Sequence, residues 1–262
     1  YSINCLNKFI HNCIMRKITV AIPHYNNSSF MNDTLGPIVN DDRVSEIIIC
    51  DDKSNDIKNL ELLLNKYNNP KIKLYKNEVN IGSYHNKINT ISKCSNEWAI
   101  LLDSDNVIDT TFLDTLYKIE NWDTTQIYAP MWAHTFPHAD NGYSPYLKFT
   151  EFKNITIGPK EFIQYWNKTN FKCLTNDCNY FAPVQQYVHC MKQYKYERMY
   201  IDSLDSSILF SDWLYNGNRV FVVDNLIYKH RLHPNSNYVN SPARRYERDI
   251  YEYMLKRMKE KA

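Results

Sequence analysis

Residues 100–107 read ILLDSDNV, an apolar run that ends in two carboxylates. In a β-strand, residues two positions apart project from the same face, so Asp103 and Asp105 are expected side by side at the tip of a strand. Two carboxylates at that distance repel each other, and a positive group between them would relieve the repulsion. The stretch therefore predicts a buried strand whose carboxyl end holds a cation.

Upstream of this stretch, short apolar runs alternate with segments of helical periodicity. Strict alternation of strand and helix favours a mainly parallel sheet with helices on both faces, which is an α/β fold. The predicted strands span residues 17–23, 45–50, 71–76 and 98–102, and the predicted helices span residues 29–39, 57–67 and 82–93.

Downstream of residue 110 the pattern loosens, and no internal repeat or low-complexity linker interrupts the chain. We therefore expect a single domain over residues 1–262, with one half at 17–110, a second half at 111–240 and a C-terminal helix at 241–262. The elements predicted here are a strand at 126–131, an irregular region at 132–146, helices at 159–166 and 205–215, and strands at 219–223 and 226–230. The chain is expected to close with an amphipathic helix at 241–261. One stripe of this helix carries Tyr246, Ile250, Tyr253, Met254 and Arg257.

Polar residues follow each of the first four predicted strands. They are PHYNN at 23–27, DDKS at 51–54, NEVNIG at 77–82 and DSD at 103–105. Ligands of parallel α/β sheets bind at the carboxyl ends of the strands. These four segments are therefore expected to line one polar cleft.

The carboxylates of Asp103 and Asp105 suit a hard divalent cation, Mn²⁺ or Mg²⁺, which keeps coordination positions open for phosphate oxygens. A cation held there would neutralise a diphosphate group. The alternative is that the two acids cap the following helix, whose amino end attracts negative charge. The spacing of the two acids alone does not decide between these interpretations.

Two further segments favour a ligand. A carboxylate at Asp51 or Asp52 would accept hydrogen bonds from a nucleobase or ribose, and the alternative there is a solvated turn. In the segment from Asn80 to Asn86, Gly82 permits close backbone approach, and free amides at the start of the helix favour phosphate. Together the segments predict a nucleotide-diphosphate site.

Composition and charge exclude several classes of protein. The 262 residues carry 31 basic and 29 acidic side chains, and the resulting net charge of +2 predicts no nucleic-acid partner. No apolar run reaches the roughly 20 residues that span a bilayer, so a soluble protein is expected. Seven cysteines without a regular pattern predict reduced thiols, no zinc site and a cytoplasmic, reducing compartment. Because the sequence begins at Tyr1, a targeting signal upstream is left open.

The basic C-terminal helix offers a route to peripheral membrane association. A solvated face of an ordinary helix is the favoured interpretation. The basic residues are Arg244, Arg245, Arg248, Lys256, Arg257 and Lys259.

The order and spacing of these segments resemble the nucleotide half of the inverting glycosyltransferases of family 2, which have the GT-A fold. The resemblance is specific over residues 17–110 and thins out through the second half. It returns at residues 205–217 and in YKHRLHPNS at 228–236, which is similar to the family's terminal Tyr-Arg-x-His-x-x-Ser segment. The resemblance implies a Rossmann-like nucleotide-binding half fused to an acceptor-binding half.

The resemblance also implies roles for individual residues. Asp52, with Asp51 near it, would contact the uracil and ribose end of a nucleotide-sugar donor, and Asp103 would address the ribose. Asp105, together with Asp103, would bind the metal. A histidine of the terminal segment would complete the metal site or touch the diphosphate; spacing favours His233, with His230 as the alternative. The remaining donor-binding residues would be Pro23, Tyr25, Asn26, Asn80, Gly82, Asn86 and Ser104.

An inverting transfer needs a base that deprotonates the acceptor hydroxyl. The family's carboxylate near the start of a helix corresponds to Asp205, whose spacing to Gly217 fits better than that of Asp202. The family's second adjacent acid is replaced here by Ser206, which leaves open whether Asp205 is the base or a helix cap.

The function that these features favour is a metal-dependent, inverting transfer of a sugar from a nucleotide diphosphate, most readily a UDP-sugar, to a hydroxyl of a glycan or glycoconjugate. One alternative is a haloacid dehalogenase-like phosphohydrolase that uses Asp103 and Asp105, although that family carries the motif on its first strand. A sugar nucleotidylyltransferase would need a glycine-rich loop after the first strand, where this chain has PHYNNSS. A third alternative is a non-catalytic module that binds sugar nucleotides or glycans.

Overall fold

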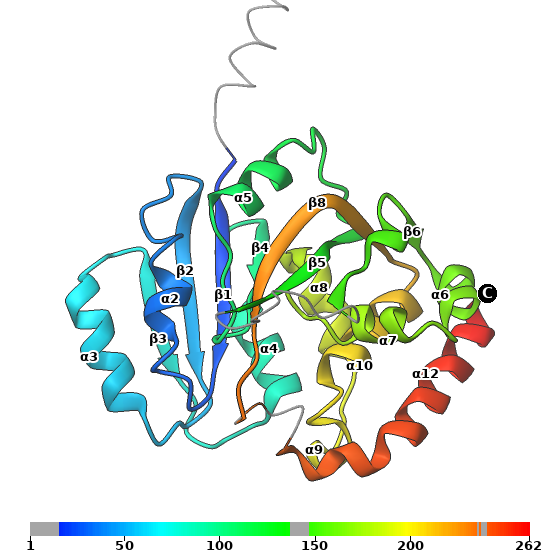
Figure 1. The fold of residues 1–262 in the computed structure, drawn as a ribbon. Coiled ribbons are helices and arrows are strands. Elements are labelled where there is room, and N and C mark those ends of the chain that lie inside the picture. The colour runs from blue at the N-terminus through cyan, green and yellow to red at the C-terminus, as the bar shows by residue number, and fades with distance from the viewer. Residues whose placement is uncertain (1–15, 137–146, 235, 237–239) are drawn as a thin grey trace, which may run out of the picture.

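The computed structural model describes residues 16–136, 147–234, 236 and 240–262. Strands and helices alternate through its first half (Figure 1). These elements are β1 (Ile18–His24), α2 (Met31–Leu35), β2 (Val44–Asp51), α3 (Ile57–Tyr67), β3 (Ile72–Lys76), α4 (Ser83–Ile91), β4 (Trp98–Leu101) and α5 (Thr110–Tyr117).

The second half contributes shorter and less regular elements. They are β5 (Gln126–Phe136), η2 (Thr150–Phe152), β6 (Thr156–Ile157), α6 (Pro159–Tyr165), α7 (Thr169–Thr175), β7 (Phe181–Pro183), α8 (Val184–Met191), α9 (Arg198–Ile201), α10 (Asp205–Tyr215), β8 (Arg219–Arg231), η3 (Pro242–Tyr246) and α12 (Glu247–Lys261).

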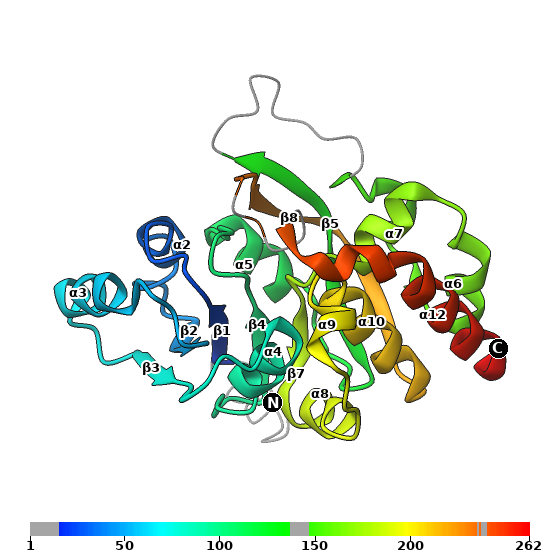
Figure 2. The ribbon, with the colours of Figure 1, turned by 90° about the horizontal axis from the view of Figure 1, so that it is seen from below.

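Within the described residues, one sheet unites the two halves in the strand order β3-β2-β1-β4-β7-β5-β8-β6. β1 runs parallel to β2 and β4, β2 runs parallel to β3, and β5 runs parallel to β8. The short strands β7 and β6 pair antiparallel with their neighbours. Figure 2 shows α2 and α5 on one side of the sheet and α4 and α8 on the other. The predicted α/β class with a mainly parallel sheet is confirmed.

The central strands are apolar along their length because helices cover both faces of the sheet. Residues 47–50 of β2 and all four residues of β4 are buried. Since β1, β2, β3 and β4 run in one direction, their carboxyl ends meet at one edge. The polar segments that follow these strands are thereby brought together.

Several predicted boundaries were wrong. The helix expected at 29–39 is only α2, because Pro37 has no amide hydrogen and cannot continue the helical hydrogen bonds beyond Gly36. The strand expected to end at residue 131 continues to Phe136, where the irregular region had been predicted, because β5 keeps pairing with β8 across a register shift. Residues 137–146 of that region lie outside the described residues.

The two strands expected at 219–223 and 226–230 form one long strand, β8, which passes through Asn225 at a positive φ of 61°. The expected C-terminal helix begins with the 3₁₀ turn η3. Seven elements of the described chain after residue 109 were not predicted, and none of them is longer than eight residues. They are α5, η2, β6, α7, β7, α8 and α9.

Helix α12 is anchored by a buried ion pair. Arg257 pairs with Asp212 of α10, and Asp212 also accepts hydrogen bonds of 2.8 Å from the hydroxyls of Tyr84 and Tyr196. Met254 of the same helix is buried, whereas Tyr253 is exposed. Arg257 is therefore not part of a solvated or membrane-facing surface, although it had been predicted to lie there with the other basic residues of the C-terminal helix.

Replacing Arg257 by methionine is expected to destabilise the fold by about 3 kcal/mol, because it leaves Asp212 charged, buried and without its cation. This corresponds to a loss of about 6 to 12 °C in Tm. Urea and thermal unfolding measure the effect. Arg248→Met is the matched control on the same helix, because the Arg248–Glu252 pair is solvent-exposed, and it is expected to unfold like the wild type. Equal stability of the two variants would contradict an anchoring role for the buried pair.

Candidate functional site

A cavity of about 1480 Å³ lies where the carboxyl ends of β1 to β4 meet the second half of the chain. All four polar segments predicted to converge contribute to its wall. Every predicted site residue except Asp51 lines it: Pro23, Tyr25, Asn26, Asp52, Asn80, Gly82, Asn86, Asp103, Ser104, Asp105, Asp202, Asp205, His230 and His233. Asn235, within the predicted terminal segment, lies outside the described residues.

Asp51 faces the protein interior. Its Oδ1 lies 2.8 Å from Nδ1 of His24, and its Oδ2 accepts a 3.0 Å hydrogen bond from the amide of Ser54. Burial by itself raises the pKa of Asp51, but the hydrogen bonds from His24 and Ser54 outweigh it and lower the pKa. Asp51 therefore orders the end of β1, and the structure does not bring it to the cavity as a ligand contact.

His24 takes a place at the cavity that the sequence did not assign. Its ring is buried and belongs to the cavity wall. Because Nδ1 is directed to Asp51, Nε2 is left without a partner among the described residues. The sequence signal for this role was the position of His24 between Pro23 and Tyr25, in the segment already expected to line the cleft.

Asp52 organises the loop that precedes α4. Its carboxylate accepts hydrogen bonds of 2.8 Å from the amides of Ile81 and Gly82 and of 2.9 Å from Asn77 Nδ2. The amides of Ile81 and Gly82 are thus bound to Asp52 and are not free for phosphate. Asn86 supports the same loop by accepting from Asn77 and donating to the carbonyl of Cys50.

Gly82 is needed in this loop for two reasons. Its φ is +86°, a conformation that side chains disfavour. A Cβ added at this position would also lie 2.6 Å from Nε of Arg198. Arg198 reaches the loop from α9 and donates to Asn80, so the second half of the chain covers the loop through this side chain.

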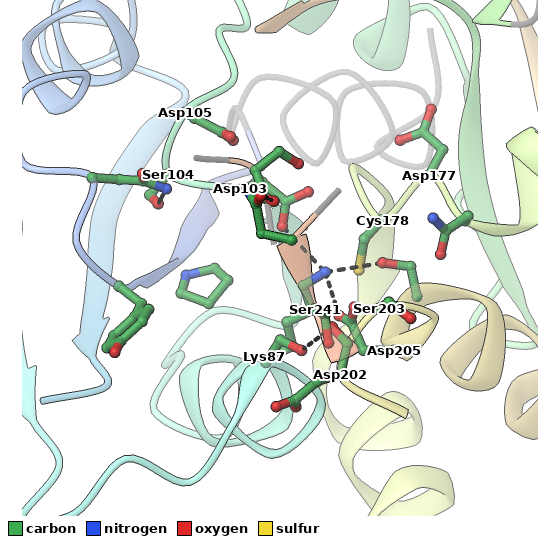
Figure 3. A pocket seen from close by; sticks show the side chains of 18 of the residues that line it. Lys87, Asp103, Ser104, Asp105, Asp177, Cys178, Asp202, Ser203, Asp205 and Ser241 are labelled. Carbon is green, nitrogen blue, oxygen red and sulfur yellow. Dashed lines mark hydrogen bonds and ion pairs between the residues drawn. The ribbon is translucent and has the colours of Figure 1, made fainter. Parts of the chain in front are cut away.

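Lys87 of α4 lies at the centre of the cavity (Figure 3). Its Nζ is 3.2 Å from Asp103 Oδ1 and 2.7 Å from Asp205 Oδ2, and it donates a 2.9 Å hydrogen bond to Ser206 Oγ. Burial by itself lowers the pKa of Lys87, but the two carboxylates outweigh it and raise the pKa well above its usual value. Burial raises the pKa of Asp103, whereas the positive charge of Lys87 acts to lower it.

Lys87 was not among the predicted site residues, although its place in the sequence carries a signal. The residue lies on the same helical stripe as Tyr84, Ile88 and Ile91, all of which are buried. A lysine within an apolar stripe must find anionic partners in the interior. Here the partners come from the tip of β4 and from the start of α10.

Asp103 and Asp105 do not lie on one face of a strand. β4 ends at Leu101, and the amide of Asn106 donates to the carbonyl of Asp103 at 3.0 Å, which closes a turn. The two carboxylates consequently have different neighbours. Asp103 faces Lys87, whereas Asp105 Oδ2 lies 2.8 Å from Nε2 of His233.

The last residue of β8 is tied to this turn. The amide of Arg231 donates to Asn106 Oδ1, and its Nε donates to the carbonyl of Asp105. This fixes His233 against Asp105, while Nδ1 of His230 lies 3.4 Å from the hydroxyl of Tyr228 instead. Of the two candidate histidines, His233 is the one in contact with a candidate metal ligand.

Asp105 and His233 offer one carboxylate and one imidazole nitrogen to a cation. This donor set fits Mn²⁺ or Mg²⁺ when phosphate oxygens and water fill the other positions. No group of three or more His, Cys, Asp or Glu side chains that could hold a metal ion occurs among the described residues. A cation at this place would therefore depend on the ligand that it accompanies.

The two candidate bases lie near each other at the start of α10. Asp205 is the first residue of the helix and follows Leu204, an N-cap residue that makes no side-chain capping hydrogen bond. Its carboxylate faces Lys87. Asp202 instead accepts a 2.8 Å hydrogen bond from Nε of Arg198, and burial raises its pKa although Arg198 opposes this.

No helix in the described part of the chain is long and apolar enough to cross a membrane. The cysteines at positions 50, 94, 173, 178 and 190 are free, and the other two lie outside the described residues.

Comparison with known proteins identifies the type of domain. The sequence matches the family model for glycosyl transferase family 2 over residues 19–188. No curated protein gives a significant match.

Solved structures with a similar fold include the S. aureus TarS fragment 1–349. In complex with UDP-GlcNAc it has a TM-score of 0.65 and 18% identity, covering 86% of this chain and 61% of that chain. In complex with UDP the values are 0.61, 18%, 83% and 61%. GalNAc-T7 with UDP, GalNAc and Mn²⁺ is also similar, with a TM-score of 0.59 and 16% identity over 92% of this chain and 49% of that chain. The predicted GT-A type is confirmed, and the chain spans about three fifths of the length of the TarS fragment.

Proposed function

Because this chain belongs to glycosyl transferase family 2, we propose that it transfers a sugar from a UDP-sugar to a hydroxyl of a glycan or glycoconjugate, with inversion and with Mn²⁺ or Mg²⁺. The observation that carries the proposal is the meeting of Asp103, Asp105, His233 and Asp205 in one cavity at the strand tips. A nucleotide-diphosphate group needs cations and hydrogen-bond donors at one end and a polar surface for the base at the other. The cavity has residues that suit each of these two ends of the ligand.

The nucleotide would bind at the end of the cavity formed by the tips of β1 and β2. Pro23, Tyr25 and Asn26 line it there, and the side chain of Tyr25 is 48% exposed, which leaves its ring accessible to a base. His24 Nε2 adds an unpartnered polar atom to this wall. Asp52 would act on the donor through the loop that it orders, and Asp103 would face the ribose.

The diphosphate would lie across the turn at residues 103–105. Asp105 and His233 would hold the divalent cation, which when bound would neutralise the charge of the diphosphate leaving group. Lys87 holds Asp103 and Asp205 in a fixed relation, because its ammonium group contacts both carboxylates. The donor and the base would thereby be positioned by the same side chain.

Asp205 would accept the proton of the attacking acceptor hydroxyl. Its carboxylate lies in the cavity wall and pairs with Lys87 at 2.7 Å, a position that supports the catalytic interpretation. Asp202 is held by Arg198 and is the alternative base. A haloacid dehalogenase-like phosphohydrolase is disfavoured by the family match, which includes the turn at residues 103–105.

Thermal unfolding across UDP-, GDP- and dTDP-sugars, each with Mn²⁺ and with a chelator, tests donor binding. A UDP-sugar with Mn²⁺ at 100 times its Kd is expected to stabilise the protein by about 2.7 kcal/mol, because a ligand that binds only the folded state raises its stability by mass action. The chelator is expected to remove most of the shift. No shift with any nucleotide sugar would contradict the proposal, and binding without transfer would favour a non-catalytic module.

A further inference from the structure

Asp177 is a buried carboxylate with no role in the mechanism above. It lies in the loop between α7 and β7 and lines the cavity. Figure 3 shows it on the opposite side of Asp103 from Ser104. Asp177 therefore borders the part of the cavity that lies beyond the proposed nucleotide end.

One oxygen of Asp177 is fully engaged. Oδ1 accepts hydrogen bonds from the amide of Asn179 at 3.1 Å, from Asn179 Nδ2 at 3.0 Å and from the hydroxyl of Tyr228 at 3.1 Å. Asn179 Oδ1 in turn accepts from the amide of Asp103 at 3.1 Å. The position of Asp177 is thus fixed relative to the turn that carries Asp103 and Asp105.

The other oxygen, Oδ2, is buried and has no hydrogen-bond partner among the described residues. The side chain is only 6% exposed, and burial raises the pKa of Asp177 to about 6. Leaving a buried carboxylate oxygen unpaired is unfavourable, so such an atom calls for a donor that the chain itself does not supply. A hydroxyl group of a bound molecule would supply it.

The surroundings indicate what kind of molecule would fit. This end of the cavity is bounded by Thr169 and Lys172 of α7 and by Glu247 and Tyr251 of α12. Lys172, Glu247 and Tyr251 also line an adjoining cavity of about 470 Å³, so an occupant can extend beyond the first cavity. At this end of the first cavity the carboxylates of Asp177 and Glu247 outnumber the ammonium group of Lys172, which disfavours an anionic group beside Asp177. A neutral sugar there offers hydroxyls to the carboxylates and an apolar face to a tyrosine ring. The adjoining cavity is more basic, because Arg244, Arg245 and Arg248 also line it, so the neutral unit is assigned to the position beside Asp177 alone.

We propose that the part of the cavity between α7, Asp177 and the first turns of α12 is the acceptor subsite, and that Asp177 Oδ2 accepts a hydrogen bond from a hydroxyl of a neutral sugar unit. This inference rests on the proposed function. It assigns the substrate class of the acceptor and a residue that selects it.

The test is an Asp177→Asn variant. The three donors around Oδ1 keep the amide oxygen in that position, so the amide nitrogen takes the place of Oδ2 and can no longer accept. Tyr228→Phe is the matched control, because it removes one donor to Oδ1 and leaves Oδ2 unchanged. The probes are methyl glycosides of glucose, galactose, GlcNAc and GalNAc, titrated by saturation-transfer NMR into protein that holds UDP and Mn²⁺.

The Asp177→Asn variant is expected to bind the preferred glycoside about tenfold more weakly or worse, which corresponds to loss of a hydrogen bond to a charged group. Its binding of UDP and of UDP-GlcNAc is expected to stay at the wild-type level, and Tyr228→Phe is expected to lose less than threefold in glycoside affinity. Thermal unfolding of both variants checks that the fold is kept.

Four results would overturn the inference. They are unchanged glycoside affinity in Asp177→Asn, an equal loss in Tyr228→Phe, no glycoside binding to the wild type, or weakened binding of UDP-GlcNAc but not of UDP. The last result would assign Oδ2 to the donor sugar. Failure of the proposed function is distinguishable, because then the wild type would bind neither UDP nor any nucleotide sugar.

Discussion

Replacing Asp105 by alanine is expected to abolish metal-dependent binding of the donor while the fold stays intact. Asp105 Oδ2 and His233 Nε2 are 2.8 Å apart, and without the carboxylate only the imidazole would remain to hold the cation. Loss of groups that merely support metal ligands lowers metal affinity 10–100-fold, so loss of a ligand is expected to weaken donor binding more than about 100-fold. Isothermal titration calorimetry with a UDP-sugar, with and without Mn²⁺, measures the effect.

Asp224→Ala is the matched control. Asp224 lies on β8 and pairs with Lys153 at 3.7 Å, so its loss also removes an ion-paired carboxylate, but Asp224 does not line the cavity. The control is expected to bind the donor like the wild type. If Asp105→Ala kept wild-type affinity for a UDP-sugar, the assignment of the metal site to Asp105 and His233 would be wrong.

Replacing Asp205 by asparagine is expected to spare donor binding and to lower kcat by about 10²–10⁴-fold, because a positioned general base contributes that much to proton transfer. The amide fits the same space but cannot take a proton at neutral pH. Lys87 keeps its contact with Asp103, so the donor end of the cavity should change little. Release of UDP during transfer measures kcat, and calorimetry measures donor affinity.

Asp202→Asn separates the two candidate bases. Its carboxylate is held by Arg198, and its replacement is expected to change kcat far less than that of Asp205. Unchanged turnover in Asp205→Asn together with a large loss in Asp202→Asn would move the base to Asp202. Loss of donor binding in Asp205→Asn would show instead that the Lys87 cluster supports the donor site rather than the chemistry.

Local patterns in the sequence were sufficient for the strand and helix order up to β4 and for most of the residues that line the cavity. An apolar run such as residues 47–50 is long enough to reveal a strand covered on both faces, and the polar residues after it mark the end of that strand. Parallel strands place their carboxyl ends at one edge whatever their order in the sheet. The convergence of Tyr25, Asp52, Gly82 and Asp103 on one cavity follows from this geometry alone.

Other features depended on partners that are distant along the chain. β7 has three residues, and only its pairing with β4 and β5 makes it a strand of the sheet. The position of His233 follows from the bonds between Arg231 and the turn at residues 103–105, which favoured it over His230 as a neighbour of Asp105.

The sequence by itself determined the alternation of strands and helices, the residues at the strand tips and the candidate acids at the start of α10. Only the tertiary structure decided what those acids contact. It paired Asp51 with His24 and brought Lys87 between Asp103 and Asp205. It also left Asp177 Oδ2 without a hydrogen-bond partner among the described residues. The reason is physical: periodicity and burial are recorded in neighbouring residues, whereas a buried charge is satisfied by whichever group the packing of distant elements brings within hydrogen-bond distance.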